Sequence, residues 1–318
     1  MNILVTGANG QLGKCIRDKV KSLKETENTY IYSDVVGSDD ADTEYLDIID
    51  EEEVKKFVKN SHINIIINCA AYTNVDKAEN DYEMAEALNG IAPRNLAEAA
   101  LSVGAKLIHI STDYVFNGQT FFPYGEDRIT LPTSVYGKTK VMGEEFIQQS
   151  GCKYLIFRTA WLYSEYGNNF VKTMLRLFNE KDELNVVNDQ IGTPTYAGNL
   201  AELIVNIVEC MKPLEGKETI PLLENGIYHF TDEGVCSWYD FAYRIYMAYL
   251  TTEGRQGRTP KKVKINGVTT KEYASKTKRP YYSVLDKTKY KSDFKGLHEP
   301  KNWCEDVYGV VEKVLNKQ

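Results

Sequence analysis

A tyrosine and a lysine stand four positions apart in the stretch LPTSVYGKTKVMGEE, as Tyr136 and Lys140, within a pattern typical of a helix. That spacing puts both side chains on one helix face, one turn apart. A phenol with an ordinary pKa near ~10 is a poor proton donor at neutral pH, but a nearby ammonium group lowers that pKa. The pair is therefore either a solvated helix face or a proton donor with the charge that tunes it.

A hydroxyl side chain would complete such an acid–base set by hydrogen-bonding a carbonyl as negative charge develops on its oxygen. The stretch ISTDYVF, at the end of a predicted strand, offers Ser111 and Thr112 for this role. Whether these residues do chemistry depends on the rest of the chain, which would have to supply a cofactor site and a substrate pocket.

The segment VTGANGQLG supplies a candidate cofactor site between the first predicted strand and the first predicted helix. Gly7 permits a tight turn, Gly10 lets the backbone approach a pyrophosphate, and Gly13 allows close helix–strand packing. The helix N-terminus then faces the anion. Asp34 stands 21 residues after Gly13, where a carboxylate can bind the adenosine ribose. An ordinary strand–helix turn is the alternative, but the flanking strand and helix favour the dinucleotide site.

Asp34 also bears on the choice between NADH and NADPH. A 2′-phosphate beside this carboxylate would be repelled. No Lys or Arg occurs from Ile31 to Val54 to offset the repulsion, and ten acidic residues stand there. The sequence therefore predicts use of NADH, or of both cofactors.

The elements that must position these residues alternate along the first half of the chain. Short β-branched runs predict strands, and apolar residues at helical spacing predict the helices between them. Unbroken apolar strands alternating with helices indicate a parallel sheet covered on both faces. The predicted strands are Asn2–Thr6, Thr29–Ser33, Ile63–Cys69, Lys106–Ser111 and Lys153–Arg158, and the predicted helices are Gln11–Leu23, Glu51–Lys59, Tyr82–Ser102 and Val135–Gln149.

Past Arg158 the alternation loosens, and the whole pattern predicts an α/β fold: a Rossmann-type doubly wound parallel sheet with a smaller C-terminal α/β substrate-binding region. We expect residues 1–158 to form the NAD(P)-binding domain, which also receives part of 185–225, and residues 159–318 to be mainly substrate-binding. The basic connection 251–270 is either a mobile lid over the nucleotide or a variable surface loop. The helices expected in this half are Asn169–Phe178, Gly198–Met211, Trp238–Tyr249 and Asn302–Asn316.

Composition excludes several function classes. The net charge of −7 argues against nucleic acid and anionic membranes as partners. No apolar run approaches the ~20 residues of a membrane helix. The six cysteines form no CxxC pair and no cluster with histidine, which predicts neither a disulfide framework nor a metal site and indicates the reducing cytoplasm. We interpret His62, His109 and His229 as structural.

The glycine turn, the strand-end Ser111–Thr112 and the Tyr136–Lys140 pair together resemble the short-chain dehydrogenase/reductase superfamily, and the glycine spacing is similar to that of its extended branch. Longer stretches resemble the dTDP-4-dehydrorhamnose reductase family, in family order and over nearly the whole chain. These stretches are GANGQLG, NCAAYTNVDKAE, STDYVFNG, YGKTKVMGE, FRTAWLY, NNFVKTML, VVNDQIGTPT, GIYHFTDEG and RPYYSVLD.

The resemblance implies NAD(P)H-dependent reduction of the 4-keto group of dTDP-4-dehydro-6-deoxy-L-mannose, a nucleotide sugar, to dTDP-L-rhamnose. It implies a catalytic set of Thr112, Tyr136 and Lys140, with Tyr136 as the proton donor. The residues that it implies along the cofactor, besides Tyr136 and Lys140, are Gly7, Asn9, Gly10, Gln11, Leu12, Asp34, Asp47, Ile48, Ala70, Ala71 and Tyr72. Those that it implies around the substrate are Thr73, Val75, Asp76, Asp113, Tyr114, Trp161 and Arg279.

Other functions of the same superfamily stay open. Dehydratases typically follow the strand-end threonine with Asp-Glu, whereas here Asp113 and Tyr114 follow Thr112, which favours simple reduction. A reductase or epimerase of another nucleotide sugar is one alternative. A non-catalytic subunit similar to the regulatory β subunit of methionine adenosyltransferase is another.

The resemblance also raises the question of a metal. Some reductases of this family dimerise through Mg²⁺ held by acidic side chains, one of them on the first helix. Here the stretch GKCIRDKV has Lys14 and Cys15 near that position, which disfavours a Mg²⁺ bridge. A monomer and a homodimer are both compatible with the sequence.

Overall fold

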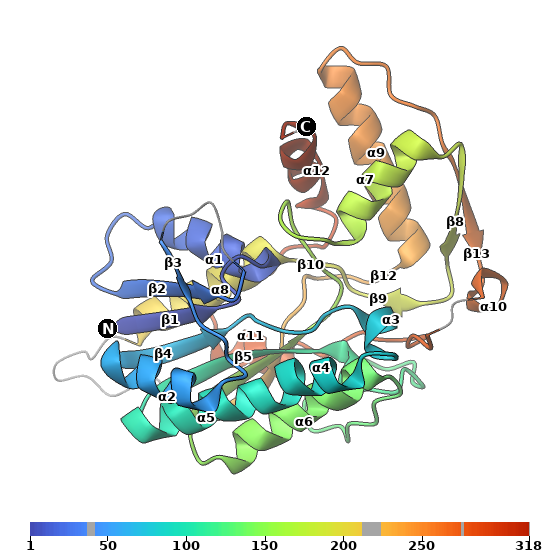
Figure 1. Cartoon of the computed structure of the whole chain (residues 1–318). Helices are drawn as coiled ribbons and strands as arrows, with labels where there is room; N and C mark the ends of the chain where they lie inside the picture. The colour runs from blue at the N-terminus through green and yellow to red at the C-terminus, as the bar shows by residue number, and fades with distance from the viewer. Residues whose placement is uncertain (37–41, 212–223, 275–276, 318) are drawn as a thin grey trace.

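The computed structural model describes residues 1–36, 42–211, 224–274 and 277–317. A seven-stranded parallel sheet forms its centre, in the order β11-β6-β5-β4-β1-β2-β3 (Figure 1). The chain moves outward from β1 in one direction to β2 and β3, and in the other to β4, β5 and β6. This confirms the predicted doubly wound α/β fold, in which ligands bind where the strand order reverses. The strands are β1 (Asn2–Thr6), β2 (Thr29–Asp34), β3 (Thr43–Tyr45), β4 (Ile63–Asn68), β5 (Lys106–Thr112), β6 (Lys153–Thr159) and β11 (Gly226–His229).

Helices cover both faces of the sheet, because successive strand residues point to opposite sides. In β1, Ile3 and Val5 pack in the layer of α1 (Gln11–Lys21) and α8 (Ala197–Cys210), whereas Leu4 packs in the opposite layer. Strands with both faces buried explain the unbroken apolar runs in the sequence. The helices of the opposite layer are α2 (Glu51–Asn60), α5 (Ala92–Val103) and α6 (Val135–Gln149).

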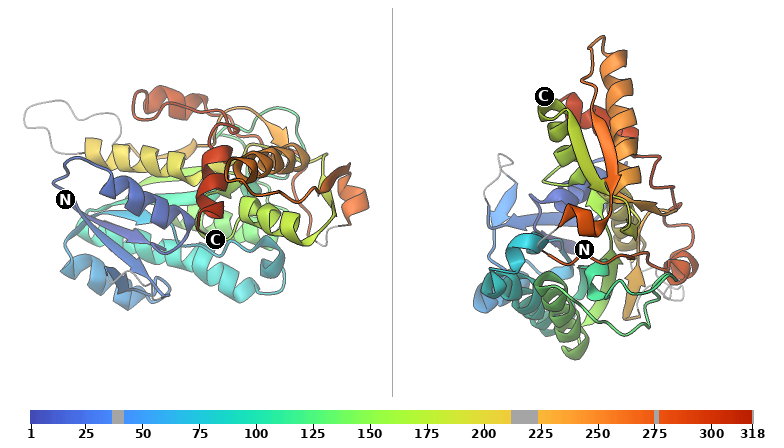
Figure 2. Two further views of the ribbon diagram at one scale, coloured as in Figure 1. Left: turned by 90° about the horizontal axis from the view of Figure 1, so that it is seen from above. Right: turned by 90° about the vertical axis from the view of Figure 1, so that its right-hand side faces the viewer.

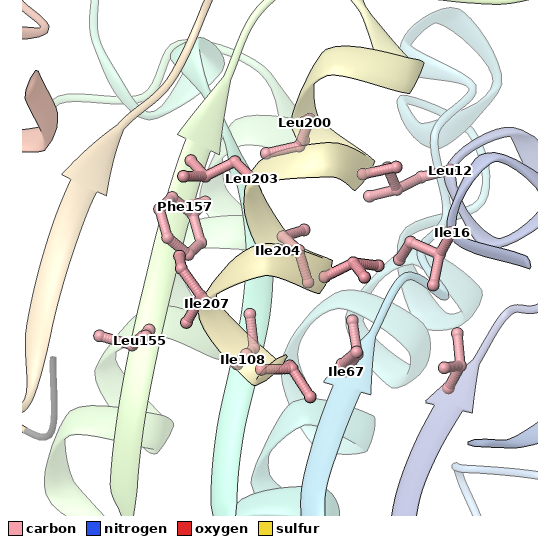
Figure 3. Close-up of a cluster of buried hydrophobic side chains, with 14 of the residues drawn as sticks. Leu12, Ile16, Ile67, Ile108, Leu155, Phe157, Leu200, Leu203, Ile204 and Ile207 are labelled. Carbon is pink, nitrogen blue, oxygen red and sulfur yellow. The ribbon is translucent and has the colours of Figure 1, made fainter. Parts of the chain in front are cut away.

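α8 comes from the second half of the chain but packs on the sheet beside α1. Its apolar side chains meet those of α1 and of the strands in one buried cluster. Each such leucine or isoleucine contributes about 1.5–3 kcal/mol by leaving water, so this segment is an integral part of the sheet layer. Figure 3 shows Leu200, Leu203, Ile204 and Ile207 of α8 beside Leu12, Ile16, Ile67, Ile108, Leu155 and Phe157.

A second region stands to one side of the carboxyl ends of the strands and has its own apolar core (Figures 1 and 2). It holds three helices, α7 (Phe170–Glu180), α9 (Trp238–Arg255) and α12 (Val307–Leu315), and the parallel pair β8 (Glu183–Val187) and β13 (Lys264–Val268). Short strand pairs connect it to the sheet region: β7 (Leu162–Tyr163) with β10 (Thr195–Tyr196), and β9 (Ile191–Gly192) with β12 (Cys236–Ser237). The remaining short helices are α3 (Val75–Ala78), α4 (Tyr82–Glu86), η1 (Ala87–Ile91), η2 (Asp113–Val115), α10 (Thr270–Tyr273) and α11 (Thr288–Asp293).

Three predicted helices differ from the structure by an interruption or by more than two residues at one end. The helix predicted at Tyr82–Ser102 is interrupted by the π-helical turn η1. Pro93 explains the interruption, because proline lacks an N–H and its ring crowds the carbonyl four residues earlier, at Asn89. The helix predicted at Asn302–Asn316 begins only at Val307, and the one predicted to end at Tyr249 runs on to Arg255.

The basic connection 251–270 is largely part of the second region. Its first residues extend α9, and its last form β13 against β8. Between them, the backbone N–H groups of Lys261 and Val263 donate to the hydroxyl oxygens of Tyr249 (3.3 Å) and Tyr246 (2.9 Å). These contacts fix the segment to α9 and support neither a lid nor a loose loop.

In the described parts of the chain no helix is both long and apolar enough to span a membrane. The acidic residues at 37–41 and the portion 212–223 of the segment expected to join the first domain lie outside the described residues.

Candidate active site

The glycine turn between β1 and α1 depends on the close approach of backbone segments. Gly7 has a φ of +64°, and a Cβ there would lie 2.6 Å from the backbone N of Ala70. A Cβ on Gly13 would lie 2.5 Å from the carbonyl oxygen of Gly7, so only glycine lets α1 pack this close to the turn. Gly10 is the N-cap of α1 and has no side chain to occupy the first N–H groups. The turn therefore fits the pyrophosphate of a dinucleotide.

Asp34, at the end of β2, is bonded to this turn. Its carboxylate accepts from the backbone N–H of Asn9 (3.0 Å) and of Val36 (3.1 Å). A positive charge also lies at this end of the site: the Arg17 guanidinium stacks on Tyr32 at 4.1 Å and donates to the Thr43 hydroxyl (2.8 Å). Sequence reasoning missed Arg17, because it comes from α1 and not from the acidic stretch after β2.

Not every residue implied along the cofactor presents its side chain. The side chains of Leu12 and Ile48 lie in the apolar clusters on either face of the sheet, which leaves only their backbone for a ligand. The Asp47 carboxylate accepts from the backbone N–H of Ile49 (2.9 Å). The Gln11 side chain bridges to the second region, where it donates to the Leu162 carbonyl (3.1 Å).

Ala70, Ala71 and Tyr72 follow β4 next to the glycine turn, and all three are partly exposed. Asn89, in the π-helical turn, fixes this segment: its Oδ1 accepts from the backbone N–H of Tyr72 (2.9 Å), and its Nδ2 donates to the Tyr72 carbonyl (3.1 Å). Asn89 also donates to Thr139 on α6 (3.2 Å). The only sequence signal for this residue was Pro93, four positions later.

Tyr136 and Thr112 are brought together as the resemblance implies. Ser134 caps α6 and starts the helix that carries Tyr136. The phenol is hydrogen-bonded to the Thr112 hydroxyl at the end of β5. Ser111, the other candidate, is buried and donates instead to Glu144. The geometry thus selects Thr112 from the two strand-end hydroxyls.

The expected effect of Lys140 on Tyr136 is absent from the site as it stands. Burial raises the pKa of Tyr136 to about 12, and the hydrogen bond with Thr112 opposes this rise. Burial also lowers the pKa of Lys140 to about 8, although the carboxylate of Glu144 acts in the other direction. A fully buried lysine is partly neutral near pH 8, so Lys140 does not carry the full ammonium charge expected of a lysine on a solvated helix face.

Lys140 has neighbours that the sequence did not suggest. Its Nζ donates to the carbonyl oxygen of Ile110 (2.6 Å) and lies 3.2 Å from Nε2 of His109. The other ring nitrogen of His109 lies 3.1 Å from Nδ2 of Asn68, at the end of β4. His109, which we interpreted as structural, thus lies between Asn68 and Lys140.

Asp113 is a buried carboxyl next to Thr112. Burial raises its pKa to about 6, against the hydrogen bonds that it receives from Ser283 and Thr112. Its Oδ2 has no hydrogen-bond partner among the residues that the structure describes. The neighbouring Tyr114 packs edge-on against Tyr136, with ring centroids 5.5 Å apart. An unpartnered buried oxygen beside two hydroxyl groups is suited to a ligand that carries hydroxyls.

The segment after β4 carries three of the residues implied around the substrate. Thr73 is exposed and Val75 half-buried. Asp76 of α3 accepts from Arg279 at 2.8 Å. Partial burial opposes ionisation of Asp76, but hydrogen bonds with Thr277 and Arg279 outweigh it and lower its pKa. This ion pair joins α3 to the segment around Arg279.

Trp161 stands just after β6, in a left-handed backbone conformation with φ of +48°. Its ring stacks on Trp238 of α9, with centroids 3.6 Å apart and planes 10° from parallel. Gly192 lies under the ring, where a Cβ would come 2.6 Å from Trp161 Cε2. Trp161 is partly exposed, lies between the two regions and has a strained backbone, so core packing alone does not account for its position.

No group of three His, Cys, Asp or Glu side chains suited to a metal ion occurs within residues 1–36, 42–211, 224–274 and 277–317. Lys14 and Cys15 lie on α1, as expected, and Cys15 is buried.

Comparison with known proteins identifies the family of the chain. Residues 1–316 match the family described as RmlD substrate binding domain. The dTDP-4-dehydrorhamnose reductase of Aggregatibacter actinomycetemcomitans is 40% identical over 301 residues, 95% of each chain. A crystal structure of a dTDP-4-dehydrorhamnose reductase from Clostridium acetobutylicum has a TM-score of 0.81 at 40% identity and covers 100% of both chains. One from Bacillus anthracis, in complex with NADP, has a TM-score of 0.78 at 35% identity and covers 97% of this chain and 98% of its own. The chain therefore belongs to the RmlD substrate binding domain family.

Proposed function

We propose that this chain is an NAD(P)H-dependent reductase of the 4-keto group of dTDP-4-dehydro-L-rhamnose, which it converts to dTDP-L-rhamnose. The observation that carries the proposal is the hydrogen-bonded pair of Thr112 and Tyr136, with Lys140 behind it, at the strand ends beside an open glycine turn. The relatives named as dTDP-4-dehydrorhamnose reductases, which match almost the full chain, supply the sugar and the base.

A bound reduced nicotinamide supplies the hydride that attacks the sugar C4 carbonyl. Tyr136 donates its proton to the carbonyl oxygen, so that one hydride and one proton together give the alcohol. The Thr112 hydroxyl donates to Asp113 in this structure (3.0 Å), and would turn its one proton to the same carbonyl oxygen when the substrate binds. Lys140, in its charged form, stabilises the phenolate that Tyr136 leaves behind.

We assign the remaining roles from the position of each residue relative to the glycine turn and the strand ends. We assign the residues of 1–158 at the glycine turn and after β2 and β4 to the cofactor, and residues 159–318 mainly to the substrate. Asp113, with its unpartnered Oδ2, accepts from a sugar hydroxyl. Arg279 binds the diphosphate, in exchange for its contact with Asp76.

The cofactor preference rests on two opposite charges. Asp34 disfavours a 2′-phosphate, whereas Arg17, next to Tyr32 and Thr43, offers it a cation. We therefore propose use of both NADH and NADPH. Replacing Arg17 with methionine is expected to lower kcat/KM for NADPH about tenfold, because one charge-assisted hydrogen bond is lost, and to leave the value for NADH nearly unchanged. An equal loss with both cofactors would contradict this role.

The setting of the reaction is inferred from the cysteines and the substrate. All six cysteines are free thiols, as suits a reducing compartment. We propose a cytoplasmic enzyme that acts on a soluble nucleotide sugar, as a monomer or a homodimer without a Mg²⁺ bridge.

The test is a turnover assay of the purified chain with dTDP-4-dehydro-L-rhamnose and either NADH or NADPH, followed by loss of the reduced-nicotinamide absorbance. Formation of dTDP-L-rhamnose with either cofactor supports the proposal. Cofactor binding without turnover of this sugar would contradict it. Other nucleotide 4-keto sugars, and a methionine adenosyltransferase catalytic subunit as a binding partner, would then separate the two alternative functions.

A further inference from the structure

A chain of buried polar groups runs from the glycine-turn side of the sheet to Lys140. The backbone N–H of Ala70 donates to Oδ1 of Asn68 (3.1 Å), and the Thr6 hydroxyl donates to the same oxygen (2.8 Å). Nδ2 of Asn68 lies 3.1 Å from Nδ1 of His109, and Nε2 of His109 lies 3.2 Å from Nζ of Lys140. The side chains of Asn68, His109 and Lys140 are all at most 1% exposed.

The donors in this chain fix which nitrogen of His109 carries its proton. A backbone N–H can only donate, so the Asn68 atom facing Ala70 must be the oxygen. The amide NH₂ of Asn68 therefore faces His109, and Nδ1 of that ring must accept. Burial and the nearby Lys140 hold the pKa of His109 well below its ordinary value, so the ring is neutral and has one proton. That proton is on Nε2, the nitrogen that faces Lys140.

This tautomer of His109 affects the protonation of Lys140. An Nε2–H group needs an acceptor, which a neutral amine provides through its lone pair and an ammonium group does not. Nζ keeps its own donor bond to the Ile110 carbonyl (2.6 Å) in either state. The other titratable groups near Lys140 are Glu144, whose carboxylate favours the ammonium form, and Tyr136 one turn earlier on α6. The charge of Glu144 is largely taken up by its buried ion pair with Arg158 (2.6 Å).

We propose that His109, held by Asn68 as the Nε2–H tautomer, is a positioning residue that directs this N–H at Lys140 and favours the neutral amine. The effect on turnover rests on the role of Lys140 in the proposed function. The tautomer of His109 and the protonation of Lys140 do not depend on that role. Only the charged amine stabilises the phenolate of Tyr136. His109 would therefore set the pH above which the reductase loses activity.

The tautomer is measured first, by long-range ¹H–¹⁵N correlation spectra of the ligand-free full chain labelled at histidine. The chain has four histidines, and a His109→Gln variant identifies the signal of His109 by its loss. We expect the pattern of a neutral ring protonated at Nε2. A ring protonated at Nδ1, or at both nitrogens near neutral pH, would overturn the proposal without any substrate being present.

Two matched variants then test the effect on Lys140. In His109→Gln the amide nitrogen takes the place of Nε2 and keeps an N–H directed at Lys140. In His109→Asn the shorter amide replaces Nδ1 and bonds only to Asn68, so no side-chain N–H is directed at Nζ, which keeps its bond to the Ile110 carbonyl. The pKa of Lys140 is read from ¹³Cε-lysine spectra as a function of pH, with Lys140→Arg to identify the signal.

We expect the pKa of Lys140 to rise by about one in His109→Asn, as it does when a buried lysine loses an unfavourable neighbour, and to stay within about 0.3 of the original in His109→Gln. The alkaline limit of kcat should move by the same amount, while cofactor affinity at pH 7 changes less than about twofold. Equal pKa values in both variants and the original chain would overturn the proposal. If His109→Asn does not fold, a Lys140 pKa in His109→Gln that departs by about one or more overturns it equally.

Discussion

The inner wall of the site, made by β5 and α6, differs from its rim, made by α3 and the segment around Arg279. On the inner wall, the side chains of Lys140 and Glu144 are about 1% exposed, and each contacts a polar partner. At the rim, the side chains of the Asp76–Arg279 ion pair are 60% and 26% exposed. Buried polar groups lose much when a partner is removed, whereas solvent replaces lost partners at the rim. Substitutions should therefore act on chemistry and stability at the wall, and on affinity at the rim.

The largest effect is expected at the proton donor. Tyr136→Phe removes the hydroxyl that donates to the carbonyl oxygen and should lower kcat about 10²–10⁴-fold, the usual contribution of a positioned acid. The Kd for NADH, from a fluorescence titration, should stay nearly unchanged. Turnover within about threefold of the original enzyme would exclude Tyr136 as the donor.

Removing one partner of the buried ion pair should cost the most stability. Glu144→Gln leaves the Arg158 guanidinium buried without a carboxylate, which is expected to lower the free energy of unfolding by about 3 kcal/mol. Glu180→Gln is the matched control, since its ion pair with Arg176 is exposed and contributes less than about 0.5 kcal/mol. Urea unfolding of the two variants measures the difference. Similar losses of unfolding free energy in Glu144→Gln and Glu180→Gln would contradict the expected difference between buried and exposed ion pairs.

Ionisation of Asp113, on the inner wall, should lower the free energy of unfolding as pH rises. Its pKa is raised to about 6 from an ordinary 3.8, so the folded protein binds its proton more tightly than the unfolded chain does. The resulting loss of stability is absent below pH 3.8, develops up to about pH 6, and amounts to about 1–3 kcal/mol above it. Asp113→Asn should therefore be more stable than the original chain at pH 8 and equally stable near pH 4. A stability gain independent of pH would contradict this account.

At the rim, the expected effect is smaller and falls on KM. Arg279→Met removes the proposed contact with the diphosphate and should raise KM for the nucleotide sugar about tenfold, with kcat nearly unchanged. Lys278→Met is the control, because Lys278 is the exposed cation next in sequence. An equal change in the two variants would indicate general attraction of an anion and not a specific contact.

Several parts of the site could be predicted because they are local in sequence. The glycines of one turn and the Tyr136–Lys140 pair on one helix owe their relative positions to a few backbone torsion angles. The residues that modify them come from far along the chain. His109 is 31 residues before Lys140, and Asn89 contacts Thr139 across 50 positions. No periodicity or motif encodes such contacts.

The sequence by itself determined the alternation of strands and helices, the glycine turn and the placing of Tyr136 and Lys140 on one helix, since each depends on side-chain type and short-range spacing. Only the tertiary structure put Thr112 rather than Ser111 against Tyr136, brought Arg17 to Asp34's end of the site, and buried Lys140 beside His109. The physical reason is that burial and hydrogen-bond direction decide protonation. Both are properties of the packed sheet and its neighbours, which no single segment has alone.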